Sequence, residues 1–146
     1  MSEKTERERQ FWDQWAKEHI QNYDADFLSH VHDLVFSFCA KNVSQRHILE
    51  MGCGSESFFT PNDAKTIFGL DISKNQLENY PHTPVLADMM QFTFSTRFDI
   101  ALFPASLHHC PNKYESILNN VCQHLDEQGV LALIEPNLFH PHRIAQ

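Results

Sequence analysis

Apolar and polar positions alternate along this chain in two patterns, one typical of buried strands and one typical of amphipathic helices. Short, mostly apolar runs of the first kind lie at 48–51, 66–70, 85–87, 98–103 and 130–134. Apolar residues recur at helical spacing over 5–19, 26–40, 73–80 and 113–125. Because expected helices and strands alternate along most of the chain, the pattern predicts an α/β fold with a parallel sheet and right-handed crossovers.

Two connections carry local signals of their own. After the first strand, Ser55 is a good helix N-cap, and Pro61 ends the short helix that this cap predicts. Before the last strand, Gly129 is expected to mark a turn.

The expected helix over 5–19 has an aromatic face that includes Trp12 and Trp15. Such a face fits a helix that packs on the core. It also fits a lid that would cover a ligand cleft together with Tyr23.

The expected strands end in glycines, acids or loop-forming residues. Gly52 and Gly54 follow the first strand, and they lack the Cβ atoms that keep a ligand away from the backbone. Asp71 ends the second strand, 71 − 52 = 19 residues after the first glycine, where a carboxylate can accept hydrogen bonds from ribose hydroxyls. Asp88 ends the third strand, and 104–109 follow the fourth. Parallel strands bring these ends to one edge of the sheet, so the sequence predicts a nucleotide-cofactor site there.

Composition narrows the expected partners and compartment. The chain has 146 residues, of which 42% are hydrophobic and 12 are Phe, and this suits one globular domain with a substantial core. Its formal charge is −8, so neither a nucleic acid nor an anionic membrane is an expected partner. The sequence has no apolar run long enough for a membrane span, and its charged start, MSEKTERERQ, does not resemble a signal peptide. We therefore expect a cytoplasmic protein.

Cysteine and histidine spacing does not predict a metal site. The four cysteines form no C-x-x-C pair, and none of the near pairs of histidines has the i, i+4 spacing of a helical two-histidine site. Buried reduced thiols are the expected state of the cysteines.

Five motifs in order resemble those of class I S-adenosylmethionine-dependent methyltransferases over about 10–137, nearly the whole chain. They are EMGCGSE at 50–56, similar to the family's acid-x-Gly-x-Gly-x-Gly, then GLDIS from 69, LADMMQF from 86, FDIALFPASLHHC from 98 and VCQHLDEQGVLALIEPN from 121. The resemblance implies a Rossmann-like parallel sheet of order 3-2-1-4-5 flanked by helices. It implies a single domain with N-terminal helices over 1–45, a cofactor-binding core over 46–137 and a tail over 138–146. It also implies S-adenosyl-L-methionine as cofactor and methyl transfer to a small-molecule acceptor.

The resemblance gives each matched position a role. Glu50 would hold the ammonium of the cofactor's methionine portion, directly or through water, and the glycine turn would let that portion approach the backbone. Asp71 would bind the ribose hydroxyls, and Asp88 would bind the adenine amino group. The adenine would lie between Ile72 and Met89. The full set of cofactor-binding residues so implied is Glu50, Gly52, Cys53, Gly54, Asp71, Ile72, Asp88, Met89 and Pro104.

A base is needed only when the acceptor must lose a proton. His109, with His108 as the alternative, follows the fourth strand where the methyl group would face its acceptor. A capping or packing role for both histidines stays open. Cys53 is interpreted as a small turn residue rather than a nucleophile.

The chain departs from the family pattern at several points. Glu56 stands where the third glycine is expected and would bring a negative charge beside the cofactor's carboxylate. Relatives carry two further strands that this chain lacks, which would leave 130–134 as an open apolar edge and predicts a homodimer or a partner subunit there. A non-catalytic methyltransferase-like subunit, or a truncated fragment, is therefore an alternative. A nicotinamide-dependent oxidoreductase is disfavoured because Ser57 occupies the last glycine position of Gly-x-Gly-x-x-Gly.

Overall fold

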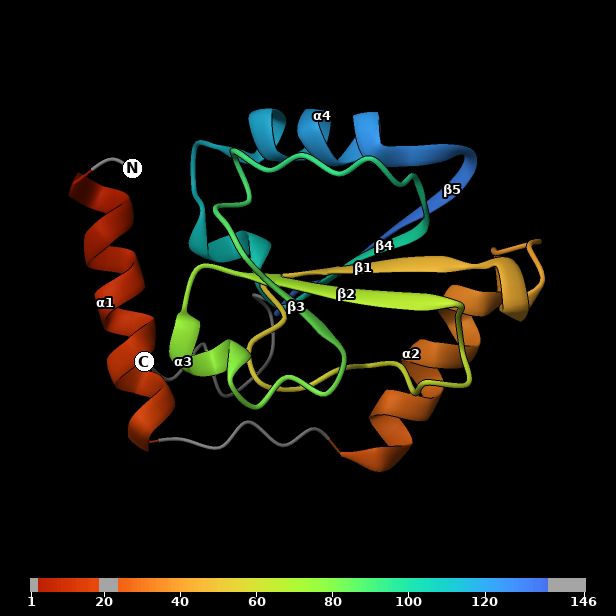
Figure 1. Cartoon of the computed structure of the whole chain (residues 1–146), viewed down its shortest axis with the longest axis horizontal. Coiled ribbons are helices and arrows are strands. Elements are labelled where there is room, and N and C mark those ends of the chain that lie inside the picture. Colours follow the sequence, from red (N-terminus) through yellow and green to blue (C-terminus); the bar gives the residue numbers. More distant parts are fainter. Residues whose placement is uncertain (1–2, 19–23, 137–146) are drawn as a thin grey trace.

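The computed structural model describes residues 3–18 and 24–136 (Figure 1). Tyr23, the proposed tail over 138–146 and the end of the expected first helix at His19 lie outside the described residues. The helices are α1 (Glu3–Glu18), α2 (Ala25–Ser37), α3 (Lys74–Leu77) and α4 (Tyr114–His124), with short 3-10 helices η1 (Val43–Gln45) and η2 (Leu107–His109). The strands are β1 (His47–Met51), β2 (Thr66–Asp71), β3 (Thr83–Leu86), β4 (Phe98–Pro104) and β5 (Leu125–Ile134).

The strands form one five-stranded sheet in the order β3-β2-β1-β4-β5, with every neighbouring pair parallel. This confirms the predicted Rossmann-like α/β fold and its strand order. β1 lies at the centre of the sheet, where Leu49 pairs with Phe68 on one side and with Ala101 on the other. From β1 the chain adds β2 and β3 toward one edge of the sheet, and it then returns to add β4 and β5 on the other side of β1. Ligands of such sheets bind beside the point at which the strand order reverses.

Side chains of the central strands alternate between two apolar layers, because successive residues of a strand point to opposite faces. Leu49 and Met51 belong to the layer that includes Ile117 and Val121 of α4. Ile48 belongs to the other layer, which includes Val31 and Val35 of α2. Figure 1 shows α4 and α2 on opposite faces of the sheet in agreement with this alternation.

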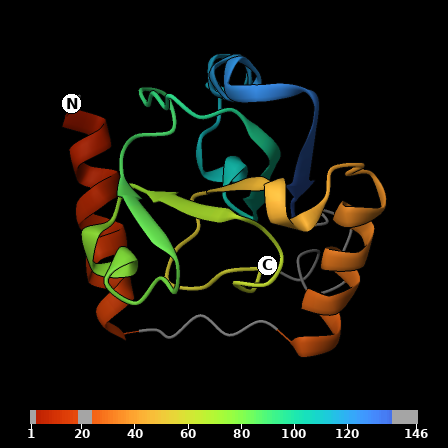
Figure 2. The same cartoon turned by 45° about the vertical axis from the view of Figure 1, so that its right-hand side comes forward.

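The helix α1 covers neither face of the sheet. It stands beside α3, across the edge at which the strands end, and both views show it on the opposite side of the molecule from α2 (Figures 1 and 2). Its position brings residues from the start of the chain to the edge where the sequence predicts a ligand site.

The first crossover does not contain the expected short helix near Ser55. Residues 52–65 form turns and bends instead. The Glu50 carboxylate accepts hydrogen bonds from the Ser57 hydroxyl and the Phe58 amide, and Asp63 accepts from the Thr60 amide at 2.6 Å. Because these side chains accept from backbone N–H groups that a helix would otherwise use, the segment forms a loop. The prediction of a short helix near Ser55 was therefore wrong.

Several element boundaries also differ from the prediction. β5 begins at Leu125, directly after α4, so Gly129 lies inside a strand rather than in a turn before it. The pairing of β4 with β5 shifts there, from Phe98 opposite Leu125 to Ile100 opposite Val130. β3 includes Pro84, which an edge strand tolerates because one of its sides makes no ladder hydrogen bonds.

Candidate active site

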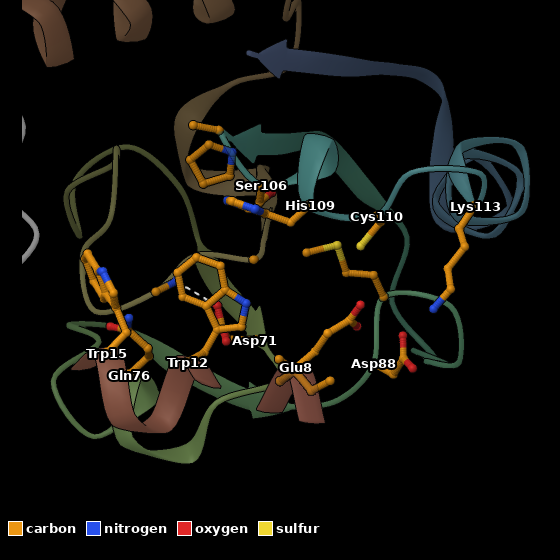
Figure 3. Close-up of a pocket in the computed structure, with 16 residues that line it drawn as sticks. Glu8, Trp12, Trp15, Asp71, Gln76, Asp88, Ser106, His109, Cys110 and Lys113 are labelled. Carbon is orange, nitrogen blue, oxygen red and sulfur yellow. Dashed lines mark hydrogen bonds between the residues drawn. The ribbon is translucent and has the colours of Figure 1, made fainter. Parts of the chain in front are cut away.

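A cavity of about 280 Å³ lies at the carboxyl ends of the strands, between the sheet and α1 (Figure 3). Its lining comes from the loops after four strands and from three helical segments. The lining residues are Glu8, Trp12, Trp15, Gly52, Gly54, Asp71, Ile72, Gln76, Asp88, Met89, Pro104, Ala105, Ser106, His109, Cys110 and Lys113. Eight of the ten site residues expected from the sequence are therefore brought together, and Glu50 and Cys53 are the two that do not line the cavity.

The glycine turn after β1 depends on glycine at both positions. Gly52 and Gly54 have φ values of 66° and 64°, in the left-handed region that side chains other than glycine rarely adopt. A Cβ atom on Gly52 would lie 2.5 Å from the Met89 Cε and from the Ser106 Cβ. The Met89 and Ser106 side chains therefore pack directly against the backbone of Gly52, and only a residue without a Cβ atom fits there.

The two glycine amides are used within the protein. The Gly52 N–H donates to the Leu70 carbonyl at 2.6 Å, and the Gly54 N–H donates to the Asp71 Oδ2 at 2.9 Å. These N–H groups thus fix the turn to β2.

Asp71 is 9% exposed and ends β2 at the cavity wall. Its Oδ2 accepts from Gly54, and its Oδ1 accepts from the Ser73 amide at 2.8 Å. Burial raises the pKa of this carboxyl, and the amide hydrogen bonds oppose that rise. A carboxylate has about four acceptor positions, so it retains capacity for two ligand hydroxyls after these bonds are made.

Asp88 follows β3 and lies at the other end of the cavity, where Figure 3 also shows Glu8 and Lys113. Its Oδ1 accepts from the Met90 amide at 2.9 Å, which fixes the turn after the strand. No other donor within the described residues occupies this side chain. Met89, the next residue, also lines the cavity and adds an apolar side chain to the wall beside Asp88.

The structure separates the two adjacent histidines after β4. His109 lines the cavity, and its ring packs edge-on against the Trp12 ring with centroids 4.8 Å apart. His108 does not line the cavity, and its Nδ1 lies 2.7 Å from a carboxylate oxygen of Glu135. Of the two candidates, His109 is therefore the one placed to reach a ligand.

Glu50 is completely buried behind the glycine turn. Its carboxylate accepts hydrogen bonds from Ser57, the Phe58 amide and the Tyr80 hydroxyl. Burial raises the pKa of Glu50 to about 7, and the three hydrogen bonds act in the opposite direction. The protein itself thus satisfies this buried carboxylate.

Two further residues of the turn region lie away from the cavity. Cys53 is 2% exposed, and burial raises the pKa of its thiol, which suits a small packing residue rather than a nucleophile. Glu56, half-buried, is not among the lining residues, so its charge lies outside the cavity wall.

Sequence reasoning missed several lining residues, chiefly Glu8, Gln76, Ser106, Cys110 and Lys113. The spacing of Glu8, Trp12 and Trp15, which share one face of α1, is a signal that could have identified Glu8. The others depend on tertiary packing. The Ser106 hydroxyl, for example, donates to the Met51 carbonyl 55 residues away at 2.5 Å.

In the described part of the chain, no group of three or more histidines, cysteines, aspartates or glutamates is arranged to hold a metal ion. Among the described helices, none combines the length and the apolar composition that crossing a bilayer requires.

Comparison with known proteins gives one family and many similar structures. Residues 49–133 match the family model described as a methyltransferase domain. The sequence has no significant match among curated proteins.

Three of the similar solved structures are described by their TM-score, sequence identity and coverage. DesVI from Streptomyces venezuelae has a TM-score of 0.64 and 19% identity, and the match covers 79% of this chain and 51% of that one. Magnesium protoporphyrin IX methyltransferase (ChlM) from Synechocystis, with bound SAM, has a TM-score of 0.66 and 13% identity over 86% of this chain and 74% of that one. The N-methyltransferase NodS from Bradyrhizobium japonicum, in complex with S-adenosyl-L-homocysteine, has a TM-score of 0.63 and 17% identity, with coverage of 84% and 71%. This chain thus spans about half of the length of DesVI.

Proposed function

Because the chain belongs to the methyltransferase-domain family, we propose that it transfers a methyl group from S-adenosyl-L-methionine to a small-molecule acceptor. The observation that carries this proposal is the cavity in which the glycine turn, Asp71 and Asp88 meet at the ends of three neighbouring strands. Two of the similar structures hold SAM or its product, which supports the choice of cofactor.

The residues present fit this cofactor. Asp71 would accept the two ribose hydroxyls with the acceptor positions that Gly54 and Ser73 leave open. Asp88 would accept the adenine amino group through Oδ2, since its Oδ1 is already used by Met90. Ile72 and Met89 are the expected contacts of the adenine faces.

The remaining expected contacts lie around the glycine turn and the end of β4. Gly52 and Gly54 line the cavity and would lie beside the methionine portion, and Pro104 would lie at the sulfonium end. Cys53 would support this turn from behind. We propose that Glu50 also acts from behind it, by anchoring 57–58, because its carboxylate is already satisfied by protein donors.

The bound cofactor supplies an activated methyl group on a positively charged sulfur, which leaves as a neutral thioether. The protein's own contribution is to hold the acceptor in line with that methyl group and to exclude water. An acceptor that is protonated at its nucleophilic atom must lose that proton, and the acceptor's freed electron pair then forms the new bond to carbon. His109 is the candidate base, because its ring lines the cavity and a histidine exchanges protons near neutral pH.

A methyl-transfer assay tests this proposal. The protein is incubated with methyl-labelled cofactor and a panel of small amines, phenols and carboxylic acids, and labelled product and S-adenosylhomocysteine are measured together. We expect labelled product with at least one acceptor class, and less of it at limiting cofactor concentration in the Asp88→Asn variant. A chain that forms no labelled product and binds no cofactor at millimolar concentration would instead fit the non-catalytic subunit.

We also propose that the open edge of β5 pairs with a second copy of the chain or with a partner subunit. Within the described residues, β5 pairs with β4 alone, and Leu133 is 48% exposed on this strand. Exposed strand edges with apolar side chains are favourable for pairing. Size-exclusion chromatography with light scattering is expected to give a dimer, or a complex with the partner when that is supplied. A clean monomer at micromolar concentration, with no partner recovered, would rule this out.

A further inference from the structure

Asp13 of α1 makes polar contacts between this helix and the start of α3. Its Oδ1 accepts from the Ser73 hydroxyl at 2.6 Å and from the Asn75 amide at 3.3 Å. Its backbone carbonyl accepts from the Asn75 side chain at 3.0 Å. The side chain of Asp13 is 17% exposed, so these bonds are largely shielded from water. Together they fix α1 to the first turn of α3.

Ser73 links this contact to the cavity. It is completely buried, its backbone N–H donates to the Asp71 Oδ1 at 2.8 Å, and its hydroxyl donates to Asp13. The same hydroxyl accepts from the Gln76 amide at 3.2 Å and so caps α3. A continuous set of hydrogen bonds therefore runs from Gly54 through Asp71 and Ser73 to Asp13.

Arg9 completes the arrangement on the outer side. Its guanidinium donates to the Asp13 Oδ2 at 2.6 Å and also binds Glu6. This pairing occupies the second oxygen of Asp13 and leaves Oδ1 for Ser73. The carboxylate is thus held in one orientation from both sides.

The helix so fixed forms one wall of the cavity. Its inner face contributes Glu8, Trp12 and Trp15, and the Trp12 ring meets the ring of His109 (Figure 3). If α1 moved away, the cavity would lose two indole rings and a carboxylate at once.

We infer that Asp13 is a positioning residue that couples the seating of α1 to cofactor binding at Asp71, through Ser73. The inference rests on the proposed function, in which Asp71 holds the ribose. In this coupling, a bound cofactor holds the Asp71 carboxylate in place. Asp71 then fixes Ser73 through its backbone N–H, and the Ser73 hydroxyl holds α1 over the bound molecule. Removal of the Asp13 carboxylate breaks this link without touching the cofactor.

The first test needs no ligand. Trp12 and Trp15 are the chain's two tryptophans and both lie on α1, so tryptophan fluorescence reports directly on the seating of this helix. Asp13→Ala is expected to shift the emission to the red and to increase quenching by acrylamide. Asp13→Asn, whose amide oxygen can still accept from Ser73 and Asn75 but whose NH₂ group cannot accept from Arg9, is expected to lie between the wild type and Asp13→Ala. Asp33→Ala, at an exposed aspartate of α2, is the matched control. Unchanged emission in Asp13→Ala would overturn the inference.

The second test measures cofactor affinity by calorimetry with S-adenosylmethionine. Asp13→Ala is expected to bind on the order of tenfold more weakly, which corresponds to about 1.4 kcal/mol, while Asp13→Asn stays within about threefold of the wild type. A red-shifted Asp13→Ala variant with unchanged affinity would show that Asp13 seats α1 without coupling this helix to cofactor binding, which overturns the inference. Failure of the wild type itself to bind would instead overturn the proposed function and the coupling with it. The fluorescence result would then still decide whether Asp13 seats α1.

Discussion

Replacement of Glu50 by glutamine should remove a specific pH dependence from the stability of this protein. The Oε1 of Glu50 accepts from the Phe58 amide at 2.8 Å, and its Oε2 accepts from the hydroxyls of Ser57 and Tyr80. A glutamine fits the same site, because its carbonyl can accept from Phe58 while its NH₂ group donates to the two hydroxyl oxygens. The variant Glu50→Gln therefore keeps the packing and the hydrogen bonds but cannot ionise.

The sign and size of the effect follow from the burial of this carboxyl. Burial raises the pKa of Glu50 from 4.5 to about 7, so the folded protein binds the proton more tightly than the unfolded chain does. The stability that this proton provides is fully present below the unfolded pKa and is lost as the pH rises through the folded one. With 1.36 kcal/mol per pKa unit, the contribution of Glu50 to the free energy of unfolding should fall by about 3 kcal/mol across this interval.

Urea unfolding followed by far-ultraviolet circular dichroism, at several pH values from about 5 to about 8, measures this contribution. The difference in unfolding free energy between wild type and Glu50→Gln cancels the titration of all other groups. The unfolding free energy of the wild type minus that of the variant should fall as the pH rises, mostly between the Glu50 pKa of 4.5 in the unfolded chain and about 7 in the folded protein. The control is Glu78→Gln, which removes an exposed carboxylate and should follow the wild type. Parallel curves for wild type and Glu50→Gln would refute the reasoning.

Three other substitutions test separate parts of the account. Gly52→Ala should lower the free energy of unfolding, measured in urea, by about 1–3 kcal/mol and should weaken cofactor binding. The reason is that the alanine would need a left-handed φ and would place a Cβ atom 2.5 Å from the Ser106 Cβ. An alanine variant of wild-type stability would contradict this. His109→Asn should reduce kcat by about 10²–10⁴ for an acceptor that must lose a proton, with little change in cofactor affinity, whereas His108→Asn, outside the cavity, should retain activity. Equal losses in both variants would favour a purely structural role for the histidine pair. Leu133→Lys should shift light scattering toward the monomer, because a lysine on an edge strand discourages pairing; an unchanged dimer would place the interface elsewhere.

Local patterns in the sequence were sufficient to predict the sheet and most of the cavity. Parallel strands must end at one edge, so Gly52, Asp71, Asp88 and Pro104 could be expected to converge before any contact was known. Helix propensity failed in the first crossover, because the buried Glu50 organises that loop through Ser57 and Phe58.

The part of the site formed by α1 could not be predicted from local patterns. The contact between Asp13 and Ser73 joins residues 60 positions apart, and neither residue belongs to a spacing that indicates the other. The aromatic face of α1 was compatible with core packing and with a lid, and the structure places it on the cavity. For the same reason Gln76 and Lys113 appear in the lining without any signal in the sequence.

We propose that the cavity between α1 and the strand ends binds S-adenosylmethionine, and calorimetric titration of the wild type, Asp88→Asn and the control Asp33→Asn measures this binding. Asparagine at 88 can still accept from the Met90 amide, so this variant removes only the carboxylate oxygen left for a ligand. We expect saturable binding of one cofactor by the wild type and by Asp33→Asn, and binding on the order of tenfold weaker by Asp88→Asn. No binding by the wild type at millimolar cofactor, or equal binding by all three proteins, would show that the cavity is not the cofactor site.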